Sequence, residues 1–164
     1  MNEATPTEAR EEALSCLEKL IEINLDAQHG FAESAAHLIE PGLQDLFIKY
    51  AAERAAFAVE LQDLERQHGK PEADDSGTAT GALHRSWINL RSSLSSESDL
   101  AILEEAERGE DAAVAAYRKA LEPADIPLPR SITSVVERHL PKVQAVHDEV
   151  RRLRNAARAV AKAS

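Results

Sequence analysis

The chain has 164 residues, a mass of 17.9 kDa and a net charge of −10 at pH 7. This length suits one ordinary domain, which we place over residues 1–164. An acidic chain is a poor partner for polyanions, so the charge argues against nucleic acid and anionic membranes. The only cysteine, Cys16, excludes an intramolecular disulfide, and no apolar run reaches the roughly 20 residues that span a bilayer. The acidic first residues do not match a targeting signal, which favours the cytoplasm.

The first predicted element is a long helix that begins at Pro6. Thr5 at the N-cap and Glu8 three residues later form a capping box, and proline is favoured at the first helical position. Apolar residues at spacings of three and four continue towards Pro41–Gly42, where both residues disfavour helix. A second helix follows at once, and a turn this short predicts an antiparallel helical hairpin over residues 6–69.

Residues 70–98 connect this hairpin to the rest of the chain. The first part, residues 70–80, is polar and rich in turn-forming residues, so we expect a loop. A short amphipathic helix follows, with an apolar face of Leu83, Trp87, Leu90 and Leu94. We expect Trp87 to pack into the side of a helical core. The serine-rich stretch Ser92–Ser98 is predicted to end this helix and to cap the next one.

A second helical hairpin is predicted over residues 99–162. Its first helix runs to Leu121 and is closed by Pro123, and its second helix begins near Ser131. Four long helices with apolar stripes can close one bundle core. The 29 residues of the connection are more than a tight turn needs, and they can carry the chain from one end of a bundle to the other. The sequence therefore predicts an all-α four-helix bundle with a long crossover that carries a short extra helix.

Polar residues interrupt the apolar stripes near the middle of this predicted bundle. Glu107 and Glu110 lie in the apolar stripe of their helix that faces the core, which we call the seam, between Leu103 and Val114. The other three helices contribute polar residues that folding brings to similar levels: Asn24, Gln28, Glu53, Arg54, His139 and His147. Burying unpaired carboxylates costs several kcal/mol each. If these residues form a buried polar layer, its carboxylates need a bound cation, arginine partners or protonation.

Five stretches that touch every long helix carry a resemblance to a known family. They are LIEINLDAQHGF (20–31), AAERAAFAVEL (51–61), GALHRSWINL (81–90), ERGEDAAVAAYR (107–118) and AVHDEVRRLR (145–154). Together they resemble an uncharacterised bacterial family of ferritin-like four-helix-bundle proteins, within the superfamily that includes rubrerythrins and bacterioferritins. The resemblance implies a ferritin-like bundle. Superfamily members with two-metal sites use a glutamate from each of two helices and a Glu-x-x-His motif from each of the other two.

This chain departs from that pattern in three places. Glu53 has no histidine three residues after it, and an amide, Gln144, stands where a carboxylate should precede His147. The first helix offers Asn24 and Gln28 where the seam needs a glutamate. A single-metal or degenerate site remains as a hypothesis, with iron or manganese as the metal. Its ligands would be Glu53, Glu107, Glu110 and His147.

Two interpretations of the polar layer stay open. One is a metal-binding bundle, and the other is a non-enzymatic interaction or stress-associated bundle whose glutamates form salt bridges with Arg54 or Arg108. The sequence contains no catalytic triad pattern, glycine-rich phosphate loop or paired-cysteine motif, which disfavours an enzyme. We expect no cofactor besides the metal, and assembly into a homo-oligomer is compatible with either interpretation.

Overall fold

The computed structural model describes residues 3–70 and 86–164. All regular elements in these residues are helical, which confirms the all-α prediction for the described part of the chain. No helix among them is both apolar enough and long enough to cross a membrane. The helices are α1 (Pro6–His37), α2 (Pro41–Gln67), α4 (Leu90–Ser95), α5 (Asp99–Ala120) and α6 (Arg130–Ala163).

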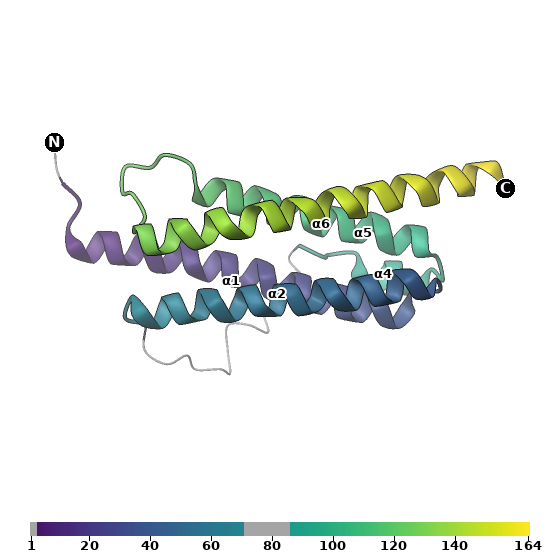
Figure 1. Cartoon of the computed structure of the whole chain (residues 1–164), viewed down its shortest axis with the longest axis horizontal. Helices are drawn as coiled ribbons and strands as arrows, with labels where there is room; N and C mark the ends of the chain where they lie inside the picture. The colour runs from purple at the N-terminus through teal and green to yellow at the C-terminus, as the bar shows by residue number, and fades with distance from the viewer. Residues whose placement is uncertain (1–2, 71–85) are drawn as a thin grey trace.

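The four long helices form one bundle in which α1 and α6 run in one direction and α2 and α5 in the other (Figure 1). At one end, the Asp99 carboxylate at the start of α5 accepts hydrogen bonds from the backbone N–H groups of Ile39 and Glu40, at 2.8 and 3.1 Å. At the other end, His68 Nε2 lies 3.1 Å from the hydroxyl of Ser131 on α6. The connection between α2 and α5 therefore passes from one end of the bundle to the other, as its length predicts.

Local sequence explains where the long helices begin. The Glu8 backbone N–H donates to the Thr5 hydroxyl at 3.2 Å, and the Glu8 carboxylate accepts from the Thr5 backbone N–H at 2.7 Å, so the predicted capping box is confirmed. Proline occupies the first position of both α1 and α2, where its missing N–H costs nothing. Ser98 caps α5 by accepting from the Ala101 N–H at 3.4 Å.

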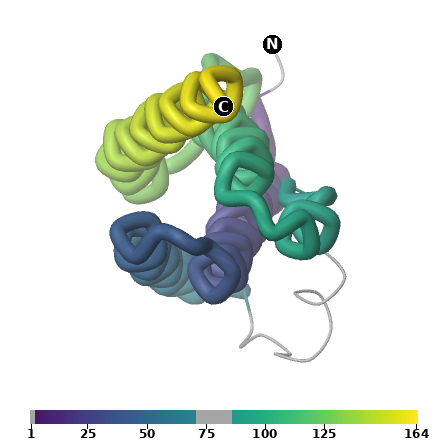
Figure 2. Tube along the Cα trace, turned by 90° about the vertical axis from the view of Figure 1, so that its right-hand side faces the viewer, coloured from purple at the N-terminus to yellow at the C-terminus, as the bar shows by residue number. Residues whose placement is uncertain are grey.

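The short helix of the crossover ends where it was predicted to end but leaves Trp87 outside it. Helix α4 spans Leu90–Ser95 and ends within the serine-rich stretch Ser92–Ser98, as predicted, whereas residues 86–89 are not helical. Leu90 is buried and Leu94 packs against the same core, so these contacts outweigh the low helix propensity of serine. Viewed along the bundle, α4 lies outside the four long helices, against α1 and α5 (Figure 2). Leu83 lies outside the described residues.

The apolar core is divided into two clusters along the bundle. One cluster contains Phe31 and Phe47 near the turn between α1 and α2, and the other contains Leu17 and Leu61 near the opposite end. The polar side chains buried between and beside these clusters include Asn24, Arg54, Glu107, Glu110, His139 and His147. The predicted interruption of the apolar stripes is therefore present in the folded chain.

Trp87 packs into the side of the bundle, as predicted, with only 1% of its surface exposed. The indole ring lies against two glycines, Gly30 of α1 and Gly109 of α5, and a Cβ atom added to either glycine would overlap the ring. Its ring centroid is 5.1 Å from that of Phe31 in an edge-to-face arrangement. The two glycines thus make the space that lets the crossover dock against α1 and α5.

Candidate metal centre

The two seam glutamates of α5 both point into the bundle, as predicted. Glu107 is 6% exposed and Glu110 is 0% exposed. Glu110 forms an ion pair with Arg54 of α2, and both side chains are fully buried. Burial raises the pKa of the Glu110 carboxyl, and the Arg54 guanidinium opposes that rise. Arg54 therefore supplies the positive charge that this carboxylate needs, as the salt-bridge interpretation predicted.

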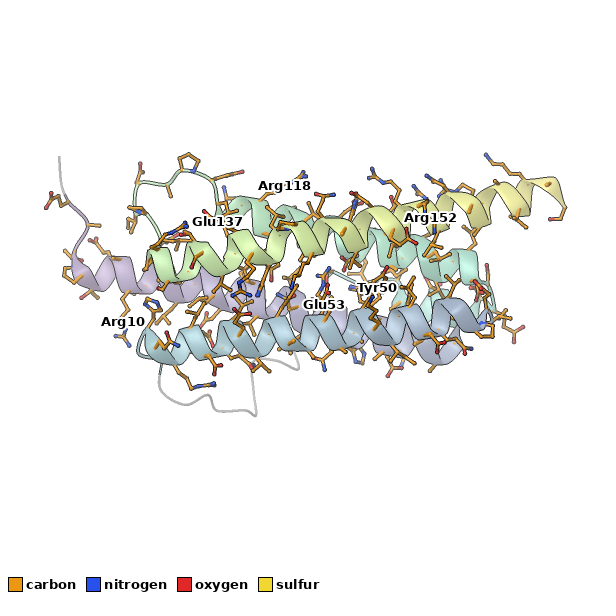
Figure 3. All side chains as sticks on the ribbon, viewed as in Figure 1. Arg10, Tyr50, Glu53, Arg118, Glu137 and Arg152 are labelled. Atoms are coloured by element: carbon orange, nitrogen blue, oxygen red, sulfur yellow. The ribbon has the colours of Figure 1, made fainter. Side chains whose placement is uncertain are left out.

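Glu53 lies beside this ion pair. Its side chain is on the same side of α2 as Tyr50, facing α6 (Figure 3). Among the described residues, one oxygen of Glu53, one of Glu110 and two guanidinium nitrogens of Arg54 are buried without a hydrogen-bond partner. A divalent cation held by these two carboxylates would have to share the layer with the permanent charge of Arg54. Glu53 and Glu110 therefore suit an ion-pair layer better than a metal site.

Glu107 faces a different set of cations, from α6. Its Oε1 accepts from Arg151 Nε at 3.1 Å, and its Oε2 lies 2.7 Å from an Nη atom of Arg154. The Arg151 side chain is 52% exposed, whereas that of Arg154 is 18% exposed. The contact of Glu107 with Arg151 is therefore easily exchanged for water, whereas Arg154 is largely buried against the bundle. Arg108, the other partner proposed for the glutamates, pairs instead with Glu105 on its own helix.

His147 of α6 lies between two carboxylates. Its Nε2 is 2.6 Å from Asp111 of α5, and its Nδ1 is 3.1 Å from Asp148. Burial lowers the pKa of His147, but the hydrogen bonds to Asp148 and Asp111 outweigh this effect, and the pKa is raised. The hydrogen bond to His147 lowers the pKa of the Asp148 carboxyl. The Nε2 atom of the imidazole is therefore directed at α5, and its Nδ1 atom is held by the neighbouring Asp148.

Glu107, Asp111 and His147 form a group with the composition of a metal site. One ligand atom from each residue can be chosen so that all three lie within 4.8 Å of one another. Glu107 and Asp111 also line a polar hollow of about 640 Å³ between α4, α5 and α6, which opens this side of the group to solvent. Two carboxylates and one imidazole, with open positions on the solvent side, can coordinate a divalent cation.

The structure thus brings together two of the four predicted ligands, Glu107 and His147, and adds Asp111. Glu110 turns to Arg54, and Glu53 lies in the same buried layer as that pair. Asp111 was not predicted as a ligand because it is exposed and lies outside the apolar seam of α5. Its position four residues after Glu107 puts both side chains on one helix face, which is the signal that could have identified it.

A family model with the description "Domain of unknown function (DUF2383)" matches residues 12–123. This match covers more than half of the chain. The chain belongs to the DUF2383 family. No curated protein matches it at a significant level.

The DUF2383 match covers most of α1 and all of α2 and α5 but ends before α6 begins at Arg130. It includes Arg54, Glu107 and Asp111. The His147 imidazole and its Asp148 partner lie beyond the matched residues. Family membership alone therefore assigns no activity to the chain.

Proposed function

We propose that this chain binds one divalent transition metal between α5 and α6, with Glu107, Asp111 and His147 as ligands. The observation that carries the proposal is that one donor atom from each residue lies within 4.8 Å of the others. Oxygen-rich ligation with one imidazole suits iron(II) or manganese(II). The polar hollow beside Glu107 and Asp111 gives the metal a route from solvent and room for water ligands.

The contacts around the group support this assignment. Asp148, 3.1 Å from Nδ1 of His147, can hold the Nδ1–H tautomer and leave Nε2 for the metal. Histidines that bind metals commonly have such a carboxylate partner on the other ring nitrogen. Arg151 must release Glu107 when the metal binds, and its half-exposed guanidinium can move into solvent. Arg154 can remain on the second oxygen of Glu107 and hold that carboxylate in place.

The experiment is a metal analysis of protein purified without chelator, together with melting curves in the presence and absence of iron(II) or manganese(II). Metal that binds only the folded state stabilises it by about 2.7 kcal/mol at a hundredfold excess over the Kd. For a chain of this size, this corresponds to a rise in Tm of roughly 5–10 °C. Metal content far below one ion per chain and an unchanged Tm would contradict the proposal.

Metal affinity is expected to rise with pH. The metal needs the neutral imidazole, and the raised pKa of His147 means that a proton competes with the metal around neutrality. Acidification through that pKa therefore weakens binding, and below it each bound metal displaces about one proton from the imidazole. Titrations at about pH 6, 7 and 8, on both sides of the ordinary histidine pKa of about 6.5, measure this effect. An affinity that does not change with pH would argue against His147 as a ligand.

A second candidate function is that of a non-enzymatic interaction or stress-associated bundle. The observation that favours it is the fully buried Arg54–Glu110 ion pair, which neutralises the central glutamate without a metal. In this account, Glu107 remains paired with Arg151 and Arg154, and His147 remains paired with aspartate, without a metal. The metal analysis distinguishes the two candidates, because only the first requires a bound ion.

We further propose that the bundle is ferritin-like, since two antiparallel hairpins joined by a long crossover are the arrangement of that superfamily.

We place the protein in the cytoplasm, on the basis of its acidic composition and single cysteine. Assembly into a homo-oligomer is also part of this proposal. Analytical ultracentrifugation tests it, with a single species at 17.9 kDa as the contrary result.

A further inference from the structure

A chain of hydrogen bonds links all four long helices beside the buried ion pair. Tyr117 of α5 is at its centre and is fully buried. The Tyr117 hydroxyl accepts from Asn24 Nδ2 of α1 at 2.8 Å and lies 2.9 Å from His139 Nδ1 of α6. His139 Nε2 lies 3.0 Å from Glu60 of α2. The chain therefore runs from the centre of the core to Glu60, whose side chain is 35% exposed.

The protonation states along this chain follow from its surroundings. Burial lowers the pKa of His139, so the imidazole is neutral at pH 7. Hydrogen bonds from Arg138 and His139 lower the pKa of Glu60 to about 2, so it is a carboxylate. The neutral imidazole must then donate its Nε2–H to Glu60, which leaves Nδ1 as the acceptor for the Tyr117 O–H. The phenol thus donates its only proton to a base.

We infer that Tyr117 is a redox-active tyrosine, which passes one electron to an outer-sphere one-electron oxidant and its phenolic proton to His139. The O–H bond of Tyr117 breaks and an Nδ1–H bond forms on His139, while the oxidant is reduced by one electron. The products are a neutral tyrosyl radical and an imidazolium. The imidazolium is stabilised by the Glu60 carboxylate at 3.0 Å, with Arg138 and Lys142 opposing it.

The surroundings of Tyr117 distinguish it from the other oxidisable rings. Tyr50, the second of the two tyrosines, makes ring contacts with Phe31 and Phe47, and in the described part of the chain no base accepts its hydroxyl proton. The indole N–H of Trp87 is buried and has no hydrogen-bond partner among the described residues. Since the pKa of each tyrosine is raised to about 12, neither can lose its proton to water first at pH 7. Within residues 3–70 and 86–164, only Tyr117 combines burial with a neighbouring base.

The test uses a photogenerated ruthenium(III) tris-bipyridine complex as the oxidant, with the radical detected by electron paramagnetic resonance and transient absorption. The Tyr50→Phe variant retains only Tyr117, and the Tyr117→Phe variant retains only Tyr50. We expect a persistent tyrosyl radical in wild type and Tyr50→Phe and its loss in Tyr117→Phe. Formation in Tyr50→Phe should be slower in D2O, because the proton moves with the electron.

His139→Gln removes the base while keeping a polar side chain at the position. It is expected to slow formation of the Tyr117 radical by about 10²-fold or more, the range of a positioned general base. A melting curve checks that this variant folds, and the D2O measurement on Tyr50→Phe needs no substitution at the base. Equal radical yields in the two tyrosine variants, or no solvent isotope effect, would overturn the inference. The test does not depend on a bound metal, so it succeeds or fails separately from the proposed metal site.

Discussion

Replacing Glu110 by Leu is expected to lower the free energy of unfolding by about 3–5 kcal/mol. The substitution leaves the Arg54 guanidinium fully buried without the carboxylate that now compensates its charge. For a chain of this size, the loss corresponds to a fall in Tm of roughly 6–20 °C. Urea denaturation followed by circular dichroism measures it directly.

Two further variants separate the charge from the packing at Glu110. The double variant Arg54→Met with Glu110→Leu removes both charges and is expected to recover most of the loss, because apolar pairs often replace buried ion pairs at little cost. Glu104→Leu removes an exposed carboxylate from the same helix, where it pairs with Arg158 at 3.1 Å, and should cost at most about 1 kcal/mol. If Glu110→Leu proves as mild as Glu104→Leu, the Arg54 charge is not left uncompensated in the bundle, which contradicts the account.

Replacing Trp87 by Ala should cost about 3–5 kcal/mol, since it empties a fully buried site between α1 and α5. Gly109→Ala should also be destabilising, by about 1–3 kcal/mol, because the new Cβ overlaps the indole ring. Thermal and urea unfolding of both variants measure these losses.

Combining the two changes gives a sharper result than either alone. Once Trp87 is absent, alanine at position 109 no longer meets the ring, and alanine is a better helix former than glycine by about 1 kcal/mol. Gly109→Ala is therefore expected to stabilise the Trp87→Ala variant while it destabilises the wild type. The same sign in both backgrounds would mean that Trp87 does not set the requirement for glycine on α5.

The features that local sequence determines were predictable. The capping box of Thr5 and Glu8 depends on two residues three positions apart, and it forms as expected. The inward direction of Glu107 and Glu110 follows from their spacing relative to Leu103 and Val114, because helical periodicity fixes which face is buried. Each of these results depends on one helix at a time.

The partners of the polar residues could not be predicted in the same way. Arginine side chains are long, and the sequence offered Arg54 and Arg108 as equivalent partners for the seam glutamates. Arg108 pairs with Glu105, whereas Glu107 takes two arginines of α6, Arg151 and Arg154. The α6 partners of Glu107 depend on the rotation of α5 against α6, which the pattern of apolar residues does not fix within one helical position, whereas Arg108 pairs three residues away on its own helix.

The same rotation explains why Asp111 replaces Glu110 in the candidate metal group. A seam defined by Leu103 and Val114 selects buried positions such as Glu110, whereas the side chain of Asp111 is 55% exposed. The Nε2 atom of the buried His147 lies 2.6 Å from this exposed carboxylate, while Glu110 pairs with Arg54. The apolar pattern of a helix therefore predicts its buried residues but not an exposed ligand such as Asp111.

The most direct test of the metal site is a calorimetric titration of manganese(II) into wild type, Asp111→Asn and Glu53→Gln. Glu53 lies in the ion-pair layer and outside the group, so it serves as the matched control on a carboxylate of the interior. We expect one site per chain in wild type, at least about tenfold weaker binding in Asp111→Asn, equivalent to about 1.4 kcal/mol, and no change in Glu53→Gln. Binding that is lost in Glu53→Gln but retained in Asp111→Asn, or absent from wild type, would contradict the proposed site.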